Sequence, residues 1–182
     1  MRLDVKNNMN KRQHKKGSEK PEQQRVIIET PRGSRNKYKY DTDTGRMRFS
    51  KVLPEGMMFP YDFGFIPNTK AEDGDPLDVL VLSDEPMFPG CQVDCRVVGV
   101  LKANQRENGE EKRNDRLIAV VDGSVLYAGV HQLSDLEPTV LKQIEQFFTN
   151  YQRVRNIEFE VIECGGSSEA SELLAKAMKD AA

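Results

Sequence analysis

The chain has 182 residues, of which 37% are hydrophobic, and its formal net charge at pH 7 is −2. A chain of this length can bury roughly 70% of its unfolded surface, so we expect a stable core without a disulfide or a structural metal. The small net charge argues against binding to nucleic acid or a membrane surface. No apolar run approaches the roughly 20 residues of a membrane span, and the start lacks a signal peptide's apolar core. We therefore expect a cytoplasmic protein.

Two regions of the chain differ in composition. Residues 1–24 are polar, basic and without hydrophobic periodicity, which is typical of a disordered or loosely attached arm. From Arg25 onwards, short apolar stretches alternate with turns rich in glycine and proline. We therefore predict a basic arm over residues 1–24 and a single domain over residues 25–182.

Short β-strands dominate the first two thirds of the predicted domain. Apolar alternation and β-branched residues indicate strands, and the turn "TDTG" between two of them indicates a hairpin. The predicted strands are 25–30, 37–41, 46–50, 78–82, 91–101 and 116–121. Short strands separated by glycine and proline are typical of a small closed barrel or a sandwich.

The pattern changes to a helical period after residue 137. Apolar residues from Val140 to Val154 recur at helical spacing, and Pro138 suits the first turn of a helix. The segment 158–163, "EFEVIE", predicts a late strand. A glycine break, a serine cap and Glu169 in the first turn then predict a C-terminal helix.

The stretch "DGDPLDVLVL" places Asp73, Asp75 and Asp78 at the entrance of a strand. Carboxylates so close together repel one another unless a cation lies between them. An EF-hand does not fit, because its sixth position requires glycine and here is Asp78. Oxygen ligands of this kind suit Mg²⁺ or Mn²⁺. A solvated acidic turn is an alternative that the pattern leaves open.

Basic residues lie near these aspartates in the sequence and favour the metal site. They are Arg32, Arg35, Lys37, Lys39 and Lys51. A site for phosphoryl transfer needs both kinds of charge, since a metal polarises the phosphoryl oxygen and activates water while lysine and arginine neutralise the leaving group.

The segment "DGDPLDVLVL" resembles the signature of the soluble inorganic pyrophosphatases. The segments "VIIETP", "GSRNKY", "FPYDFGFIPNT", "FPGCQVDCRVVGVL", "RLIAVV" and "FFTNY" occur in the order of that family, so the resemblance covers about residues 25–164. It implies a mainly β fold with some α (α+β), built on a closed OB-like five-stranded β-barrel with flanking helices and an extra hairpin. It also implies hydrolysis of diphosphate with Mg²⁺ as cofactor, for which Mn²⁺ is a possible substitute.

The resemblance also implies roles for individual residues. Asp73 and Asp78 would ligate the metals, and Asp75 would be the general base for the attacking water. Glu29 would hold metal-bound waters. The residues implied to act on the substrate are Lys37, which is also given a catalytic role, and Tyr151, Lys51 and Arg116. The resemblance does not imply a role for Lys39; we add it to this set as a cation that faces the substrate in place of a metal ion, and a surface charge that points to solvent is the alternative.

Several positions depart from the family pattern. Lys39 stands where an acid is usual, and Lys51 replaces an arginine. Phe59 and Phe63 replace tyrosines. Gln152 stands where lysine is common.

In the family that the sequence resembles, the loop that corresponds to Ala103–Arg116 normally carries two aspartates and a lysine. Here Asp115 is its only aspartate. We prefer Asp115 as a metal ligand because it lies next to a strand, and Glu110 or Glu111 remains an alternative.

Three functions are compatible with the sequence. The first is a Mg²⁺-dependent inorganic diphosphatase, and the second is a barrel of the same ancestry that binds phosphate or nucleotide in a regulatory role with weak catalysis. The third is a module for single-stranded nucleic acid, which the sequence disfavours because such modules need stacking aromatics along a basic groove. The resemblance also implies a homo-oligomer, commonly a hexamer in bacterial relatives.

Overall fold

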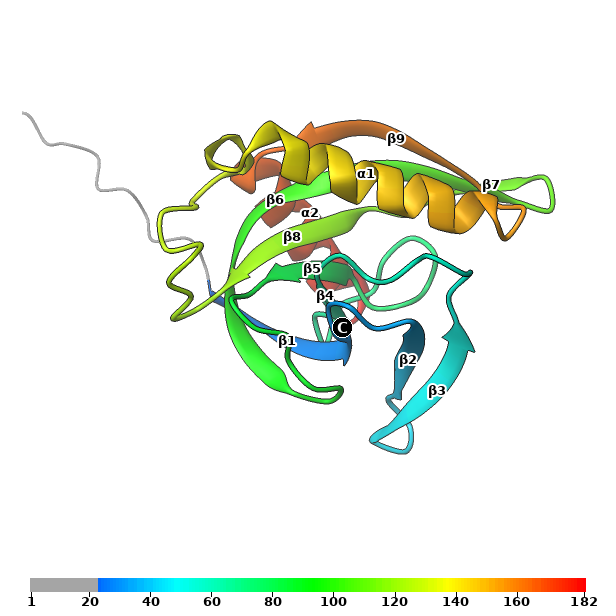
Figure 1. Ribbon diagram of the computed structural model, residues 1–182, viewed down its shortest axis with the longest axis horizontal. Helices are drawn as coiled ribbons and strands as arrows, with labels where there is room; N and C mark the ends of the chain where they lie inside the picture. The colour runs from blue at the N-terminus through cyan, green and yellow to red at the C-terminus, as the bar shows by residue number, and fades with distance from the viewer. Residues whose placement is uncertain (1–22) are drawn as a thin grey trace, which may run out of the picture.

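The computed structural model describes residues 23–182, so the predicted arm lies outside the described residues except for Gln23 and Gln24. These two residues belong to the first strand (Figure 1). The strands are β1 Gln23–Thr30, β2 Asn36–Asp41, β3 Arg46–Val52, β4 Asp62–Phe65, β5 Asp78–Leu82, β6 Gln92–Glu107, β7 Glu110–Arg113, β8 Arg116–Val121 and β9 Glu158–Gly165. The helices are the short 3₁₀ helix η1 Leu133–Asp135, α1 Pro138–Arg153 and α2 Ser167–Asp180.

Five strands form a ring of hydrogen-bonded neighbours. The order is β1, β4, β5, β8, β6, and β6 pairs with β1 again. All of these pairings are antiparallel except β5 with β8, which is parallel. The fold is therefore a mixed α+β fold built on a closed ring of strands. The predicted hairpin is also confirmed, because β2 and β3 pair only with each other among the described strands.

The long strand β6 connects most of the molecule. Its first part pairs with β1, its middle with β8, and its last part with β9 and β7. A bulge at Val98, between Val97 and Gly99, bends β6 where it pairs with β8, and a second bulge lies on the partner strand β9 opposite Lys102–Ala103. Gly99 is required at the bend of β6, because a Cβ there would lie 2.4 Å from Leu133 Cγ.

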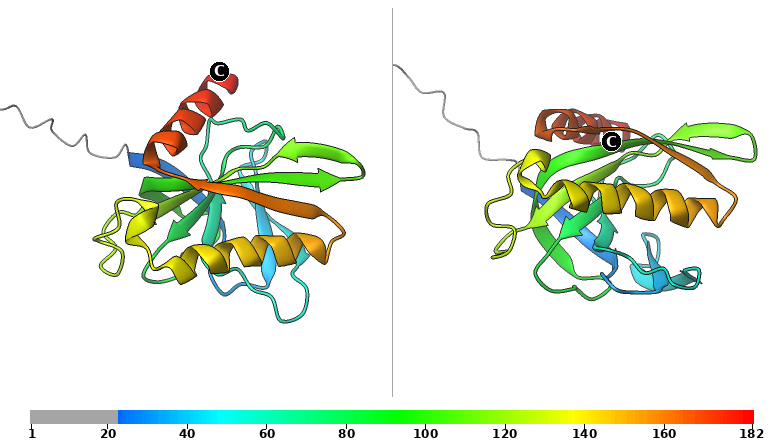
Figure 2. Two further views of the ribbon diagram at one scale, coloured as in Figure 1. Left: turned by 90° about the horizontal axis from the view of Figure 1, so that it is seen from above. Right: turned by 45° about the horizontal axis from the view of Figure 1, so that its top comes forward.

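The two α-helices lie on opposite sides of the strands β6 and β9 (Figure 2, left). Helix α1 buries Ile144, Phe148 and Tyr151, as the helical spacing predicts, in a core shared with β4, β6 and β8. Helix α2 buries Ala170 and Leu174 in a second core with β1, β5 and β8. Each helix therefore covers one side of the strand framework with its apolar stripe.

The start of α2 differs from the predicted serine cap. Ser167 is the first helical residue and Gly166 is the N-cap. The Gly166 N–H donates a hydrogen bond to Glu169 Oε2 at 2.9 Å. Glu169 therefore does lie in the first turn, as the sequence predicted, and it satisfies the backbone donor of the N-cap residue.

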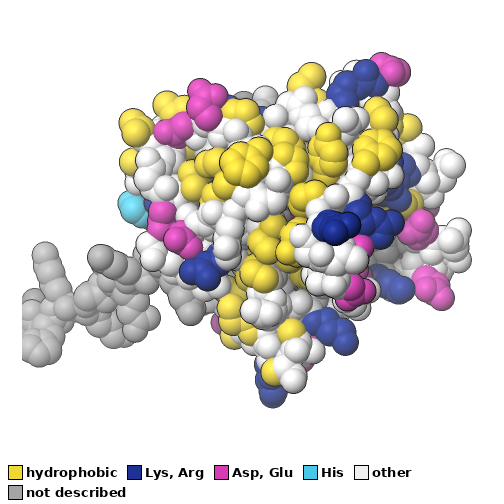
Figure 3. Space-filling view, turned by 90° about the horizontal axis from the view of Figure 1, so that it is seen from below, with side chains coloured by type: hydrophobic (Ala, Val, Ile, Leu, Met, Phe, Trp, Pro, Cys, Tyr) yellow, Lys and Arg dark blue, Asp and Glu magenta, His cyan; other side chains and the backbone are white. Residues whose placement is uncertain are grey.

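Apolar side chains are exposed over a broad area of the face seen in Figure 3, and basic side chains lie beside acidic ones there. Large exposed apolar residues of the described chain include Val125 and Leu126, which are 80% and 73% exposed, and Phe88. Neither of the two α-helices in residues 23–182 is long and apolar enough to cross a membrane.

Candidate active site

A cleft of about 330 Å³ lies between the β2–β3 hairpin, the loop that joins β4 to β5, and the adjoining ends of β6, β8 and α1. Its acidic lining residues are Glu29, Asp73, Asp75 and Asp78, and its basic ones are Lys37, Lys39, Lys51, Arg116 and Arg155. The remaining polar lining includes three amides, Gln105, Asn114 and Gln152. Every site residue predicted from the sequence therefore lines the cleft, except Tyr151 and Asp115.

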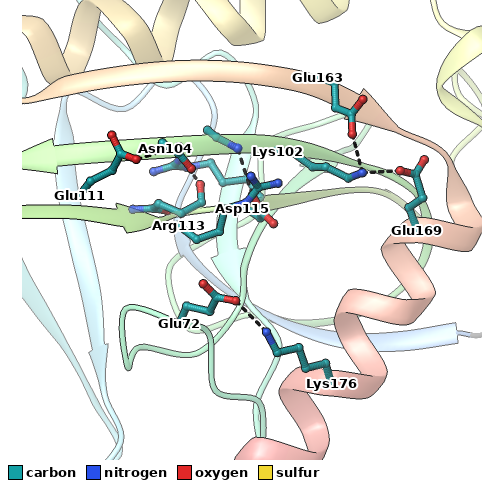
Figure 4. A network of polar contacts seen from close by, with 12 residues as sticks. Glu72, Lys102, Asn104, Glu111, Arg113, Asp115, Glu163, Glu169 and Lys176 are labelled. Atoms are coloured by element: carbon teal, nitrogen blue, oxygen red, sulfur yellow. Dashed lines mark hydrogen bonds and ion pairs between the residues drawn. The ribbon is translucent and has the colours of Figure 1, made fainter.

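The loop that carries Asp73 and Asp75 is held by hydrogen bonds. Asp73 Oδ1 accepts the backbone N–H of Asp75 at 3.1 Å, and the Asp75 carbonyl accepts the N–H of Ala71 at 2.8 Å. Gly74 between them has a φ of 93°, a conformation that favours glycine. Glu72 pairs with Lys176 of α2 at 2.7 Å, so the loop is also attached to the C-terminal helix (Figure 4).

Asp78 opens β5 and interacts with two cations, the buried Arg116 and the half-buried Lys37. Burial raises its pKa, while Arg116 and Lys37 act in the opposite direction. Arg116 Nε is 3.7 Å from Asp78 Oδ2, and the guanidinium lies 4.2 Å and 4.6 Å from the ring centroids of Phe148 and Phe159. Arg116 is thus fixed in place by aromatic packing with its charge directed at the carboxylate.

Glu29 is at the end of β1 and is 9% exposed. Its Oε1 accepts the backbone N–H of Tyr40 at 2.7 Å, which joins the ring to the β2–β3 hairpin. Burial raises the pKa of Glu29, and the hydrogen bond from Tyr40 partly offsets this effect. Strand β1 thus positions the Glu29 carboxylate at the cleft, but one of its two oxygen atoms already accepts the hydrogen bond from Tyr40.

The basic side of the cleft is crowded with positive charge. Lys37 and Lys51 are directly opposite each other on β2 and β3, an arrangement that destabilises a hairpin unless an anion is near. Burial lowers the pKa of Lys37 to about 8, and its Nζ lies 5.2 Å from the centre of the Phe63 ring. Lys39 lines the cleft, and its Nζ lies 3.4 Å from Asp75 Oδ2.

Tyr151 lies beside the cleft without lining it. It is 3% exposed, and its ring stacks on Phe147 with an interplanar angle of 2°. Burial raises its pKa, and its buried hydroxyl has no hydrogen-bond partner within residues 23–182. The predicted phosphate contact of Tyr151 would therefore require a ligand that reaches this hydroxyl.

Asp115 points away from the cleft. Its Oδ1 accepts the backbone N–H of Ala103 at 3.0 Å and pairs with Arg113 Nε at 2.6 Å (Figure 4). Successive residues of an extended chain point to opposite faces, so Asn114 and Arg116 reach the cleft and Asp115 does not. We therefore leave Asp115 out of the proposed metal ligands.

The two alternative acids of this loop also lie outside the cleft. They belong to β7, which pairs with the end of β6. Glu111 pairs with Arg106 at 2.6 Å, and Glu110 lies 3.7 Å from Lys112. The segment that the resemblance expects to complete the metal site therefore contributes no carboxylate to the cleft.

Amides also line the cleft, and sequence reasoning did not assign them a role. Asn114 Nδ2 and Gln152 Nε2 both donate to Gln105 Oε1, at 3.0 Å and 3.1 Å. Arg155 donates to Gln152 Oε1 at 2.6 Å. We call Gln105, Asn114, Gln152 and Arg155 the amide rim. The alternation of residues before β8 was the one sequence signal that pointed to Asn114.

The acidic side of the cleft fits a hard divalent cation by the chemistry of its donors. Asp73 and Asp78 offer only oxygen atoms, and burial raises the pKa of both carboxyls, a cost that a bound cation would offset. Within residues 23–182, no three acidic, histidine or cysteine side chains converge on one point. Mg²⁺ is commonly held by one or two carboxylates with water and substrate phosphate, so two aspartates suffice. The amide rim does not fit a metal ion in this way, because it is neutral or positive.

A cleft that sets carboxylates against lysine and arginine has the composition required for metal-assisted phosphoryl chemistry. Comparison with known proteins agrees, since residues 26–182 match the model of the inorganic pyrophosphatase family. The chain therefore belongs to the inorganic pyrophosphatase family.

Relatives of known sequence and structure support this assignment. The inorganic pyrophosphatase of Leifsonia xyli is 40% identical over 152 residues, which cover 84% of this chain and 91% of the relative. That of Thermus thermophilus is 43% identical over 136 residues, 75% of each chain. A crystal structure of inorganic pyrophosphatase from Thermus thermophilus superimposes with a TM-score of 0.82 at 35% identity, covering 91% of this chain and 94% of that one.

Proposed function

We propose that the protein hydrolyses inorganic diphosphate to two phosphates with Mg²⁺ as cofactor, for which Mn²⁺ can substitute. The observation that carries the proposal is the presence of Asp73, Asp75 and Asp78 in the lining of a single cleft that also holds five lysine and arginine side chains. Relatives named inorganic pyrophosphatase over most of the chain support the same substrate.

The acidic residues would have two roles, metal binding and proton transfer. Asp73 and Asp78 would hold the divalent ion, and Glu29 would orient its water shell from β1. When bound, the ion would polarise a phosphoryl oxygen and favour ionisation of water. Asp75 is 69% exposed in its side chain, so it can reach a water molecule in the cleft and accept its proton as the water oxygen attacks phosphorus.

The basic residues act on the charges of the substrate. Attack on one phosphorus breaks its bond to the bridging oxygen, which leaves with the second phosphate as an anion. Lys37, Lys51 and Arg116 line the cleft and would neutralise that charge. Lys39 would do so in place of the acid that is usual at this position. Because burial lowers the pKa of Lys37 to about 8, Lys37 is also able to transfer a proton near neutral pH.

A second function is favoured by the ion pairs within the cleft. Asp75 pairs with Lys39 at 3.4 Å and Asp78 lies 3.7 Å from Arg116, so two of the three aspartates already face a cation. These pairs compete with a metal ion for the same carboxylates. A barrel that binds phosphate or nucleotide in a regulatory role and turns over weakly is the alternative consistent with this competition.

Measurement of phosphate release separates the two functions. The diphosphatase should release orthophosphate from inorganic diphosphate in Mg²⁺ and lose this activity in EDTA, and a phosphate monoester such as p-nitrophenyl phosphate serves as the control substrate. Saturable binding of diphosphate without Mg²⁺-dependent release would favour the regulatory function.

Three further properties belong to the same proposal. We infer that the five-stranded ring is the OB-like barrel predicted from the sequence, that the protein acts in the cytoplasm, and that it forms a homo-oligomer. The exposed Val125 and Leu126 lie on the loop before η1, and apolar side chains gathered on a surface often mark subunit contacts. Sedimentation velocity should show a mass above that of one chain, with a hexamer as the expected form.

A further inference from the structure

The loop that joins β4 to β5 carries two of the three aspartates of the cleft, and its backbone has few bonds to the rest of the fold. Within residues 70–75, two backbone N–H groups donate to carbonyls of the same segment. Among the described residues, the one backbone hydrogen bond that leaves this segment runs from the Lys70 N–H to the Ala177 carbonyl of α2, at 2.9 Å. The position of the loop backbone therefore depends on the last turn of α2.

The Ala177 carbonyl is available for this bond because of its place in the helix. Helix α2 ends at Asp180, and the carbonyls of the last four residues of a helix have no N–H group within the helix to accept from. The Lys70 N–H satisfies one of these carbonyls. Ala177 is buried and packs in the second core together with Leu174, so packing fixes the position of the acceptor.

A second attachment joins the same turn of α2 to the residue before Asp73. Lys176 Nζ lies 2.7 Å from Glu72 Oε1 (Figure 4). The two side chains are 57% and 53% exposed, and an exposed ion pair contributes little to the stability of a whole protein. Its location matters more than its strength, because Glu72 and Asp73 are adjacent in the chain. A fixed Glu72 limits where the Asp73 backbone can lie.

The junction between α2 and the loop is closely packed. A cavity of only about 30 Å³ remains there, lined by residues of the loop, by residues of α2, and by Arg113 and Asp115 at the end of β7 and the residue before β8. This volume has room for a few water molecules at most. Asp115 is itself held by the Ala103 N–H at 3.0 Å. The loop therefore has little room to shift towards α2.

The two proposed metal ligands are supported in different ways. Asp78 belongs to β5, which pairs with β4 and β8, whereas Asp73 lies in the loop that α2 supports. We propose that the last turn of α2, through Lys176 and the Ala177 carbonyl, positions Asp73 relative to Asp78 for Mg²⁺ binding. Groups that orient metal ligands from outside commonly affect metal affinity. The proposal rests on the proposed function only for the assignment of these two aspartates as metal ligands.

The Mg²⁺ affinity of a variant without the Lys176 charge tests the proposal. If Lys176 acted only through its charge, removing it would favour binding of a cation nearby. Loss of positioning acts in the opposite direction, so Lys176→Gln should raise the Kd for Mg²⁺ by roughly two- to fivefold, the effect of losing one exposed ion pair. Isothermal titration of the full chain with MgCl₂ at fixed ionic strength measures the Kd. An unchanged or lower Kd would overturn the proposal.

Two further variants separate position from charge. Lys179→Gln removes the same charge from the same turn of α2 at an exposed position, and it should not raise the Kd. Lys176→Arg keeps the charge and can keep the pair with Glu72, so it should retain the affinity of the unchanged protein. A rise in Kd of the same size in Lys179→Gln would attribute the effect to the charge of the helix and would reject the positioning role.

Hydrogen exchange provides a test on the unchanged protein. Coupling between two sites is reciprocal, so if α2 supports Mg²⁺ binding, Mg²⁺ must stabilise the bond from Lys70 to Ala177. Deuterium uptake, measured by mass spectrometry, should slow for a peptide that contains Lys70 when MgCl₂ replaces NaCl at equal ionic strength. A peptide that contains Leu136, whose N–H donates to Leu133 of η1, is the control. Equal uptake by the Lys70 peptide with and without bound Mg²⁺ would contradict the coupling.

Phosphate release from diphosphate is measured on the same variants. At saturating Mg²⁺ the kcat of Lys176→Gln should be close to that of the unchanged protein, while the Mg²⁺ concentration for half-maximal activity rises with the Kd. Weaker Mg²⁺ binding by Lys176→Gln, in a protein that releases no phosphate, would reject the proposed hydrolysis alone. Hydrolysis with the same Kd and the same Mg²⁺ dependence in Lys176→Gln would reject this inference alone.

Discussion

The aspartates of the loop between β4 and β5 differ in what surrounds them. Asp78 lies at the start of β5 beside the buried Arg116, whereas Asp75 is exposed and pairs with Lys39. Asp73 is also exposed, but its Oδ1 accepts a backbone N–H from Asp75. These surroundings are compatible with the roles proposed from the resemblance, since the Asp75 carboxylate accepts no backbone hydrogen bond in the loop and is exposed to water.

Asp75→Asn should keep the fold but lower the turnover of diphosphate by roughly 10²-fold or more, the usual contribution of a positioned general base. The side chain is exposed, so the change should have little effect on the melting temperature. Steady-state phosphate release with Mg²⁺ measures the effect. Turnover close to that of the unchanged protein would remove Asp75 from the role of base.

Lys39→Glu should raise the KM for diphosphate and the Mg²⁺ concentration needed for half-maximal activity. The Lys39 ammonium lies 3.4 Å from Asp75, and its replacement would set two carboxylates side by side in the cleft. Arg46→Glu, an exposed position of the same hairpin, makes the same charge change as a control. An unchanged KM and Mg²⁺ requirement in Lys39→Glu would show that Lys39 is only a surface charge.

Lys37→Met should raise the melting temperature at pH 7 while it reduces activity. Burial lowers the pKa of Lys37 to about 8, so the charged lysine is less stable in the folded chain than in the unfolded one. This cost is present in full below pH 8 and declines as the pH rises from about 8 towards the unfolded pKa of about 10.4. The gain in melting temperature should decline over the same range.

Thermal unfolding of the two proteins between pH 6 and pH 10 measures that difference. Lys142→Met, at an exposed position of α1, provides the control and should show no comparable pH dependence. A melting temperature at pH 7 that does not rise in Lys37→Met would mean that the lysine charge is already compensated in the folded protein.

Individual elements differ in how far local sequence determines them. Helix α1 was predictable because its apolar residues recur at helical spacing, and Ile144 and Phe148 are buried as that spacing requires. Strand β7 was not predictable, because its sequence "EEKR" has no apolar alternation and depends on pairing with β6. The four-residue strand β4 was also missed, since "DFGF" is too short to show a period.

The close contact of β1 and β4 provides a prediction about the ring. Gly64 of β4 faces Ile28 of β1, and a Cβ at Gly64 would lie 2.1 Å from the Ile27 carbonyl oxygen. The backbone cannot move aside without breaking the pairing, so Gly64→Ala should lower the free energy of unfolding by about 3 kcal/mol or more, or prevent folding.

Gly129→Ala is the matched control for that variant. A Cβ at Gly129 would have no neighbour within 4 Å, so the same substitution should leave stability nearly unchanged. Urea unfolding followed by circular dichroism compares the two proteins. Equal stability of Gly64→Ala and Gly129→Ala would contradict the β1–β4 contact described here.

At the scale of the whole molecule, the cleft combines a contiguous motif with residues distant in sequence. Asp73, Asp75 and Asp78 are close in the chain, so the sequence alone could predict that they act together. Gln105 and Gln152 are brought together only when α1 packs against the strands, and no local pattern connects them. The same limit explains Asp115, since only the orientation of the chain before β8 shows that it points away from the cleft.

The last prediction follows the response of the whole fold to Mg²⁺. A ligand that binds only the folded state at 100 times its Kd stabilises it by about 2.7 kcal/mol. For a chain of this size, 1 kcal/mol shifts the melting temperature by roughly 2–4 °C, so saturating Mg²⁺ should raise it by about 5–11 °C. Asp73→Asn retains the oxygen that accepts the Asp75 N–H but loses the charge, and it should lose most of this rise.

Glu172→Ala, which removes an exposed carboxylate of α2, is the control and should keep the full response to Mg²⁺. Differential scanning fluorimetry with MgCl₂ against NaCl of equal ionic strength separates specific binding from screening of surface charge. If Mg²⁺ raises the melting temperature of Asp73→Asn as much as that of the unchanged protein, the stabilising ion does not bind at the aspartate loop. The acidic side of the cleft would then hold no metal through Asp73.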